Sequence, residues 1–167
     1  GTEVIGAQGG LRAVMDRVHQ LAPSTDPVLL LGEPGTGKRV IAHALHRASR
    51  RHEGPCITLP AGPLRDQDLR DALERARGGT LLIDDLSTLS PASQKHLLDV
   101  LLALPKDGQV PWGADSPRIV ATSHQDLEQR VRTGALREDL WYHLQTHTLR
   151  LPPLRMRTED IPALTDH

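Results

Sequence analysis

The stretch Pro27–Arg39, PVLLLGEPGTGKR, decides the fold of this chain. Its first part, Val28–Leu31, is a short apolar run of the kind that forms a buried strand. Glycines then carry the backbone through a tight turn into Lys38, where a helical pattern begins. Such a turn points backbone N–H groups into one concavity, and the helix dipole and the lysine add positive charge. The stretch therefore predicts a phosphate-binding loop rather than an ordinary strand–turn–helix corner, which is the alternative.

One position of this loop departs from the general pattern. The loop consists of Gly32, Glu33, Pro34, Gly35, Thr36, Gly37, Lys38 and Arg39. Arg39 stands where a Ser or Thr hydroxyl would hold magnesium. This arginine could contact phosphate or point to solvent, and the sequence leaves both possibilities open.

Composition restricts the class of protein. The length of 167 residues fits one domain, and 20 Lys and Arg against 21 Asp and Glu do not indicate a nucleic-acid binder. The single cysteine, Cys56, excludes a disulfide scaffold, and we expect a buried thiol in a reducing cytoplasm. The sequence contains no signal peptide and no apolar run of membrane-spanning length. The nine histidines show no metal-ligand pattern with Cys or carboxylates.

Strand-like and helical patterns alternate along the chain. Further strands are expected at Pro55–Leu59, Thr80–Asp85, Arg118–Thr122 and Thr146–Leu151. Helices are expected at Gly9–Ala22, Gly37–Arg50, Leu64–Arg77, Pro91–Leu102 with Ser90 as N-cap, Asp126–Val131, Leu136–His143 and Glu159–Leu164. This order predicts a three-layer α/β domain with a five-stranded parallel sheet.

In such a sheet, ligands bind beyond the carboxyl ends of the strands. The phosphate-binding loop follows one strand, Asp84 and Asp85 end another, and Ser123 follows a third. We therefore expect these residues to lie close together at one edge of the sheet.

Four stretches together resemble the AAA+ domain of bacterial enhancer-binding proteins, the activators of RNA polymerase carrying sigma-54. They are GEPGTGK at Gly32–Lys38, GGTLLIDDL at Gly78–Leu86, RIVATSHQDLEQRV at Arg118–Val131, and ALREDLWYHL with LRLPPLRMRTEDIPAL at Ala135–Leu164. The resemblance implies that residues 1–167 are a P-loop NTPase core cut from a longer regulator. In that family the core binds ATP at a subunit interface, assembles into a ring and remodels a promoter complex. The helical lid over the nucleotide would lie beyond His167.

The resemblance implies roles for single residues. Gly32–Lys38 would be the Walker A loop, and Val4, Ile5 and Gly6 would lie near the adenine. Asp84 would organise a magnesium ion through its water shell.

The resemblance also implies a set of catalytic positions. Asp85 takes the place of the Walker B glutamate, and Ser123 falls at the first sensor. Arg137 falls at an arginine finger that reaches into the neighbouring subunit's site. The alternative for Arg137 is a surface arginine paired with Glu138 or Asp139.

The chain departs from the family pattern in the parts that engage sigma-54 and hydrolyse ATP. Only Ala61–Arg77 is present where the family carries its GAFTGA loop, and the chain has no phenylalanine at all. Asp85 is one methylene shorter than the glutamate base. Ser123 replaces an asparagine amide by one hydroxyl. His143 stands at the second arginine-finger position and is mostly neutral near pH 7.

Three hypotheses follow. We favour a module of a transcriptional regulator that binds ATP or ADP, self-associates, hydrolyses poorly and does not contact sigma-54 through a GAFTGA loop. RNA polymerase or a sigma factor would then be engaged by another route, and DNA only by domains outside this chain. The second hypothesis is a slow but genuine ATPase, and the third is a nucleotide-free scaffold.

Overall fold

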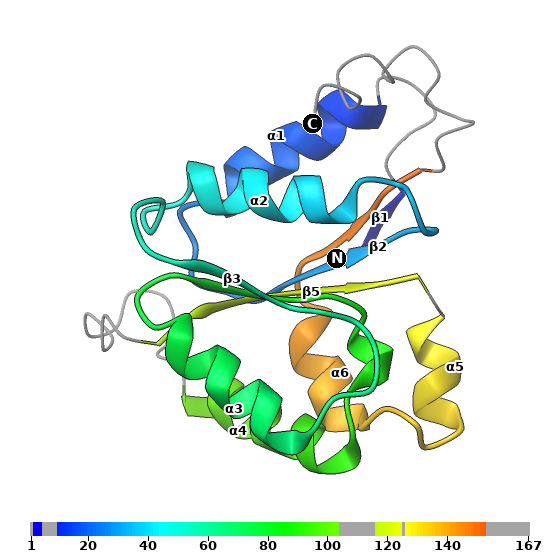
Figure 1. Ribbon diagram of the computed structural model, residues 1–167. Coiled ribbons are helices and arrows are strands. Elements are labelled where there is room, and N and C mark those ends of the chain that lie inside the picture. The colour runs from blue at the N-terminus through cyan, green and yellow to red at the C-terminus, as the bar shows by residue number, and fades with distance from the viewer. Residues whose placement is uncertain (1, 5–9, 104–115, 125, 153–167) are drawn as a thin grey trace.

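Helices cover both faces of one parallel sheet (Figure 1). The computed structural model describes residues 2–4, 10–103, 116–124 and 126–152. Within these residues the sheet has six strands in the order β1-β6-β2-β5-β4-β3, and all neighbours pair in parallel. The strands are β1 (Thr2–Val4), β2 (Val28–Leu31), β3 (Cys56–Leu59), β4 (Thr80–Ile83), β5 (Arg118–Ser123) and β6 (Thr148–Arg150). The five predicted strands are all present, and β1 adds a sixth beside β6.

The helices form the outer layers, which confirms the predicted three-layer architecture. On one face lie α1 (Gly10–Leu21) and α2 (Lys38–Ala48). On the other lie α3 (Asp66–Arg75), the short 3₁₀ helix η1 (Leu86–Thr88), α4 (Pro91–Ala103), α5 (Leu127–Arg132) and α6 (Glu138–Leu144). The expected helix at Glu159–Leu164 lies outside the described residues. Across the described ranges, no helix is long and apolar enough to cross a membrane.

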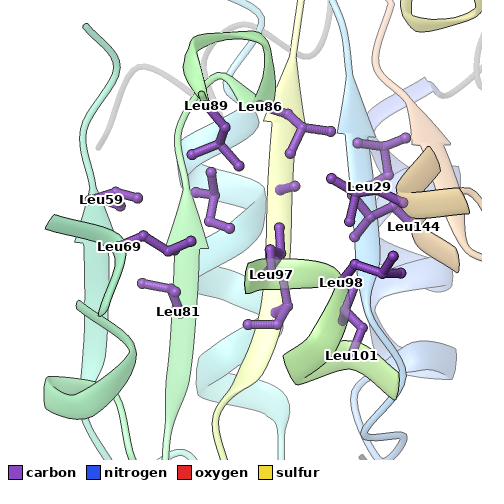
Figure 2. Packing of buried hydrophobic residues seen from close by; sticks show 14 of the residues in the cluster. Leu29, Leu59, Leu69, Leu81, Leu86, Leu89, Leu97, Leu98, Leu101 and Leu144 are labelled. Carbon is purple, nitrogen blue, oxygen red and sulfur yellow. The ribbon is translucent and has the colours of Figure 1, made fainter. Parts of the chain in front are cut away.

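Alternation along the strands builds the two apolar cores. In β2, Leu29 packs into the core beneath α3, α4 and α6, whereas Leu30 packs beneath α1 and α2. In β4, Leu81 joins the first core and Leu82 the second. Figure 2 shows the first core, where leucines of α4 lie over the central strands. Because both faces of the sheet are buried, its strands are apolar runs rather than alternating patterns.

Two side chains singled out in the sequence, Ser90 and Cys56, are both half-buried. The Ser90 hydroxyl accepts a hydrogen bond from Ser93 N–H at 3.1 Å, which confirms Ser90 as the N-cap of α4. The Cys56 thiol is half-buried rather than buried, and its Sγ lies 3.6 Å from Nδ1 of His43. Burial raises the pKa of this thiol and so disfavours the reactive thiolate.

Candidate functional site

The loop between β2 and α2 has the backbone geometry that the sequence predicted. Gly35 and Gly37 have φ angles of 83° and 90°, a left-handed region that favours glycine. A Cβ atom on Gly32 would lie 2.6 Å from Oγ1 of Thr36, so a side chain there would displace the threonine. The loop ends at the N-terminus of the 11-residue helix α2, whose first turn presents free backbone N–H groups.

The loop and the strand ends enclose one cavity of about 510 Å³. Its lining includes Gly35, Lys38 and Arg39 from the loop side, and Asp84, Asp85 and Ser123 from the ends of β4 and β5. The structure thus brings together the residues that the strand order predicted to be neighbours. A volume of this size is typical of small-molecule and cofactor sites.

Lys38 is folded back onto its own loop. Its Nζ donates hydrogen bonds to the carbonyl oxygens of Gly32 at 2.7 Å and Glu33 at 3.0 Å. Burial lowers the pKa of this lysine, while the charges of Asp84 and Asp85 partly oppose that shift. The ammonium group therefore lies at the cavity, where phosphate oxygens could replace the loop carbonyls as acceptors.

Asp84 lies between a hydroxyl and a guanidinium. Its Oδ1 accepts a hydrogen bond from Oγ1 of Thr122 at 3.1 Å, and its Oδ2 lies 3.9 Å from Nε of Arg39. The same threonine Oγ1 accepts from the Asp85 N–H at 2.9 Å. Thr122 therefore ties the end of β4 to β5, a role that sequence reasoning missed. The sequence signal that could have identified Thr122 is its position directly before Ser123, on a strand that ends at the site.

This donor set fits a magnesium ion poorly. Magnesium is normally held by one or two carboxylates and the hydroxyl after the loop lysine, and here that hydroxyl is replaced by Arg39. That Asp84 organises a magnesium ion stays a prediction, and the cation observed beside this carboxylate is Arg39.

The Asp85 carboxylate caps η1. Its Oδ1 accepts hydrogen bonds from Ser87, from the backbone N–H at 3.2 Å and from Oγ at 2.5 Å. The residue has φ 69°, the only non-glycine left-handed backbone within the described residues. Asp tolerates this conformation better than most residues because its short polar side chain bonds locally. Both contacts use Oδ1, and Asp85 also lines the cavity.

Ser123 and Arg137 lie in different surroundings. Ser123 is buried at the end of β5, and its carbonyl accepts the N–H of Gly32 at 3.1 Å, which places it against the phosphate-binding loop. Arg137 is exposed before α6 and forms a bidentate pair with Asp139, with both N–O distances 3.0 Å. This is the surface pairing that the sequence left open. An arginine finger would act on a neighbouring subunit, so the pairing within one chain does not decide between the alternatives.

Buried Gln94 of α4 holds the backbone beside Arg137. Its Oε1 accepts the Arg137 N–H at 2.8 Å, and its Nε2 donates to the carbonyls of Ala135 at 2.9 Å and Leu89 at 3.1 Å. Sequence reasoning missed this residue, because an isolated glutamine on an apolar helix carries no motif. His143, which the resemblance predicts at the second finger position, is half-buried in α6.

The predicted adenine contacts cannot be placed. Ile5 and Gly6 lie outside the described residues. Only the backbone of Thr2–Val4 is described before them, as strand β1.

Comparison with known proteins identifies relatives along nearly the whole chain. A family model described as the sigma-54 interaction domain matches residues 5–154. The chain is 37% identical over 187 residues to a Nif-specific regulatory protein of Herbaspirillum seropedicae, covering 98% of this chain and 34% of that protein. It is 37% identical over 191 residues to the DNA-binding transcriptional regulator NtrC of Escherichia coli K12, covering 99% of this chain and 40% of NtrC. The chain thus spans well under half the length of these relatives.

Solved structures of another protein have a similar fold. NtrX from Brucella abortus in complex with ATP superposes with a TM-score of 0.79 at 27% identity, covering 98% of this chain and 42% of that one. The same protein in complex with ADP also has a TM-score of 0.79. These matches confirm the P-loop NTPase fold and the family that the four sequence stretches predicted. The chain belongs to the sigma-54 interaction domain family.

Proposed function

We propose that this chain is the nucleotide-binding core of a bacterial transcriptional regulator that holds ATP or ADP and hydrolyses ATP slowly or not at all. The observation that carries the proposal is the cavity in which the glycine loop, Lys38 and the ends of β4 and β5 converge. That arrangement offers backbone N–H groups and cations to a polyphosphate. Further support comes from NtrX, which has this fold and was crystallised with ATP and with ADP.

Impaired hydrolysis is the second part of the proposal. The carboxylate at the Walker B glutamate position is one methylene short and is already bonded to Ser87. A reacting group displaced by about 1 Å can lose on the order of a hundredfold in rate. A serine at the sensor position and a histidine at the second finger position remove further interactions with the same transition state.

The proposal also assigns no sigma-54-contacting loop to this chain. Residues 60–65 join β3 directly to α3, and β4 begins at Thr80 soon after α3 ends. The alignments to the two regulators run over 187 and 191 residues although this chain has only 167. The relatives therefore carry segments without a counterpart here, which supports the loss of an inserted loop.

Self-association through the AAA+ interface completes the proposal. Arg137 precedes α6, and Tyr142 on α6 is 65% exposed, which suits a contact between subunits. Any contact with RNA polymerase or a sigma factor would use another surface, and DNA would be bound by domains outside this chain. We place the regulator in the cytoplasm.

Isothermal titration of ATP and ADP into the full-length regulator tests the proposal. We expect micromolar binding that weakens by about a hundredfold or more in Lys38→Ala, because a charge-assisted contact to phosphate is lost. Lys95→Ala is the matched control, since Lys95 pairs with Asp99 at 2.8 Å on the exposed face of α4. Absence of binding by folded protein would overturn the proposal and favour the nucleotide-free scaffold.

A further inference from the structure

Arg39 occupies the first turn of α2 and faces the carboxylate that would serve a metal. Its Nε lies 3.9 Å from Oδ2 of Asp84, and 61% of its side chain is exposed. The other carboxylate oxygen of Asp84 is engaged by the Thr122 hydroxyl. Arg39 also lines the cavity together with Lys38, so two cations border the space beside the phosphate-binding loop.

A guanidinium at this position opposes magnesium in two ways. Magnesium requires oxygen ligands in near-octahedral geometry, and a guanidinium has no lone pair to offer. A fixed positive charge beside Asp84 also repels a divalent cation and competes with it for the carboxylate. The guanidinium can itself supply what the metal would, since it is always charged and binds phosphate oxygens bidentately.

We propose that Arg39 replaces magnesium at this site, so that the chain binds nucleoside di- and triphosphates in their metal-free form. This inference rests on the proposed nucleotide-binding function. Asp84 acts as a positioning residue, because its carboxylate holds the guanidinium at the edge of the cavity until phosphate oxygens take its place. Lys38 and Arg39, which both line the cavity, then neutralise the phosphates.

The test is titration of ATP and ADP into the full-length regulator, once with magnesium and once with EDTA. For the natural sequence we expect the Kd to change by less than about threefold between the two buffers. Arg39→Ser replaces the guanidinium by the hydroxyl that P-loops in general carry at this position. In this variant we expect Kd in EDTA to rise by about tenfold or more while magnesium restores binding. The matched control is Arg47→Ser in the last turn of the same helix, which should behave as the natural sequence does.

Two results would overturn the inference while leaving nucleotide binding intact. One is a Kd for the natural sequence that rises by about tenfold or more in EDTA. The other is Arg39→Ser binding equally well in both buffers. If neither nucleotide binds in either buffer, the proposed function itself fails, and the inference fails with it.

Discussion

The carboxylate of Asp85 accepts hydrogen bonds from both the N–H and the hydroxyl of Ser87, at 3.2 and 2.5 Å. This contact closes the first turn of η1, the short helix that leads from β4 into α4. The sequence resemblance predicts that this residue stands at the position of the Walker B glutamate. The carboxylate thus caps η1, and this contact bears on the proposed slow hydrolysis because it engages one of the two carboxylate oxygens.

Substitution of Asp85 by glutamate should release this carboxylate. Glutamate is a poor N-cap, and its extra methylene lets the carboxylate extend from η1 into the cavity. We expect Asp85→Glu to raise ATP turnover by up to about a hundredfold, measured as phosphate release by concentrated, assembled protein. Ser87→Ala is the control, because it removes the hydroxyl contact but leaves the acid short. A rise in turnover with Ser87→Ala as large as that with Asp85→Glu, or no rise with Asp85→Glu, would show that side-chain length does not limit the rate.

Arg118 should contribute strongly to stability. It is 1% exposed at the start of β5 and donates to the carbonyls of Leu21 at 2.8 Å, Ala22 at 3.1 Å and Asp26 at 3.1 Å. It thus satisfies the C-terminal end of α1, where backbone carbonyls lack helical partners.

We expect Arg118→Met to lower the free energy of unfolding by about 3 kcal/mol, because buried acceptors lose a charged donor. Arg118→Lys should retain only part of the stability that Arg118→Met loses, since one ammonium group cannot reach all three carbonyls. Urea denaturation measures the free energy of unfolding of each variant, and Arg12→Met on the exposed face of α1 is the control. Equal stability of the Arg118 and Arg12 variants would contradict this role.

Stability should fall on mild acidification because of His46. Its Nδ1 lies 2.8 Å from Oγ1 of Thr80 and its Nε2 lies 3.1 Å from the Gly54 carbonyl. Burial lowers the pKa of this histidine below its ordinary 6.5. The hydrogen bond with the Gly54 carbonyl opposes that shift, and the nearby charges of His43, His52 and Arg47 add to it.

The folded state therefore keeps His46 neutral where the unfolded chain already binds a proton. Its contribution is fully present above pH 6.5 and is lost as the pH falls from there toward the lowered pKa. We expect the melting temperature to drop less steeply over this range in His46→Gln than in the natural sequence. His19→Gln, at the exposed end of α1, should leave the slope unchanged. If the melting temperature fell equally steeply with pH in all three proteins, His46 would be excluded as the source of the acid sensitivity.

The sequence predicted those strands and helices whose residue pattern is visible within a few neighbouring residues. The run VLLL of β2 and the Ile119–Ala121 segment of β5 are apolar because both faces of the sheet are buried. Ser90 and Pro91 are residue types that favour the start of a helix, here α4. Strand β1 could not be predicted, because three residues beginning with Thr2 and Glu3 carry no pattern. Pairing with β6, a tertiary contact, makes them a strand.

For the site, the sequence predicted which residues lie close together but not the individual hydrogen bonds and ion pairs that they form. The loop geometry follows from glycine positions, and the meeting of Asp84 with the loop follows from strand order. The Gln94 contacts join α4 to Ala135 and Arg137, residues far away in the sequence, and no motif encodes them. The Arg39–Asp84 pair likewise needed coordinates, because the sequence left open whether this arginine points to solvent.

The most direct test of the central claim is the fate of bound ATP. Labelled ATP is mixed with assembled full-length regulator, and the nucleotide retained on the protein is identified over time. We expect it to remain ATP for many minutes, with conversion to ADP appearing in Asp85→Glu. Conversion to ADP by the natural sequence within about a second, as in an ordinary enzyme, would contradict the account.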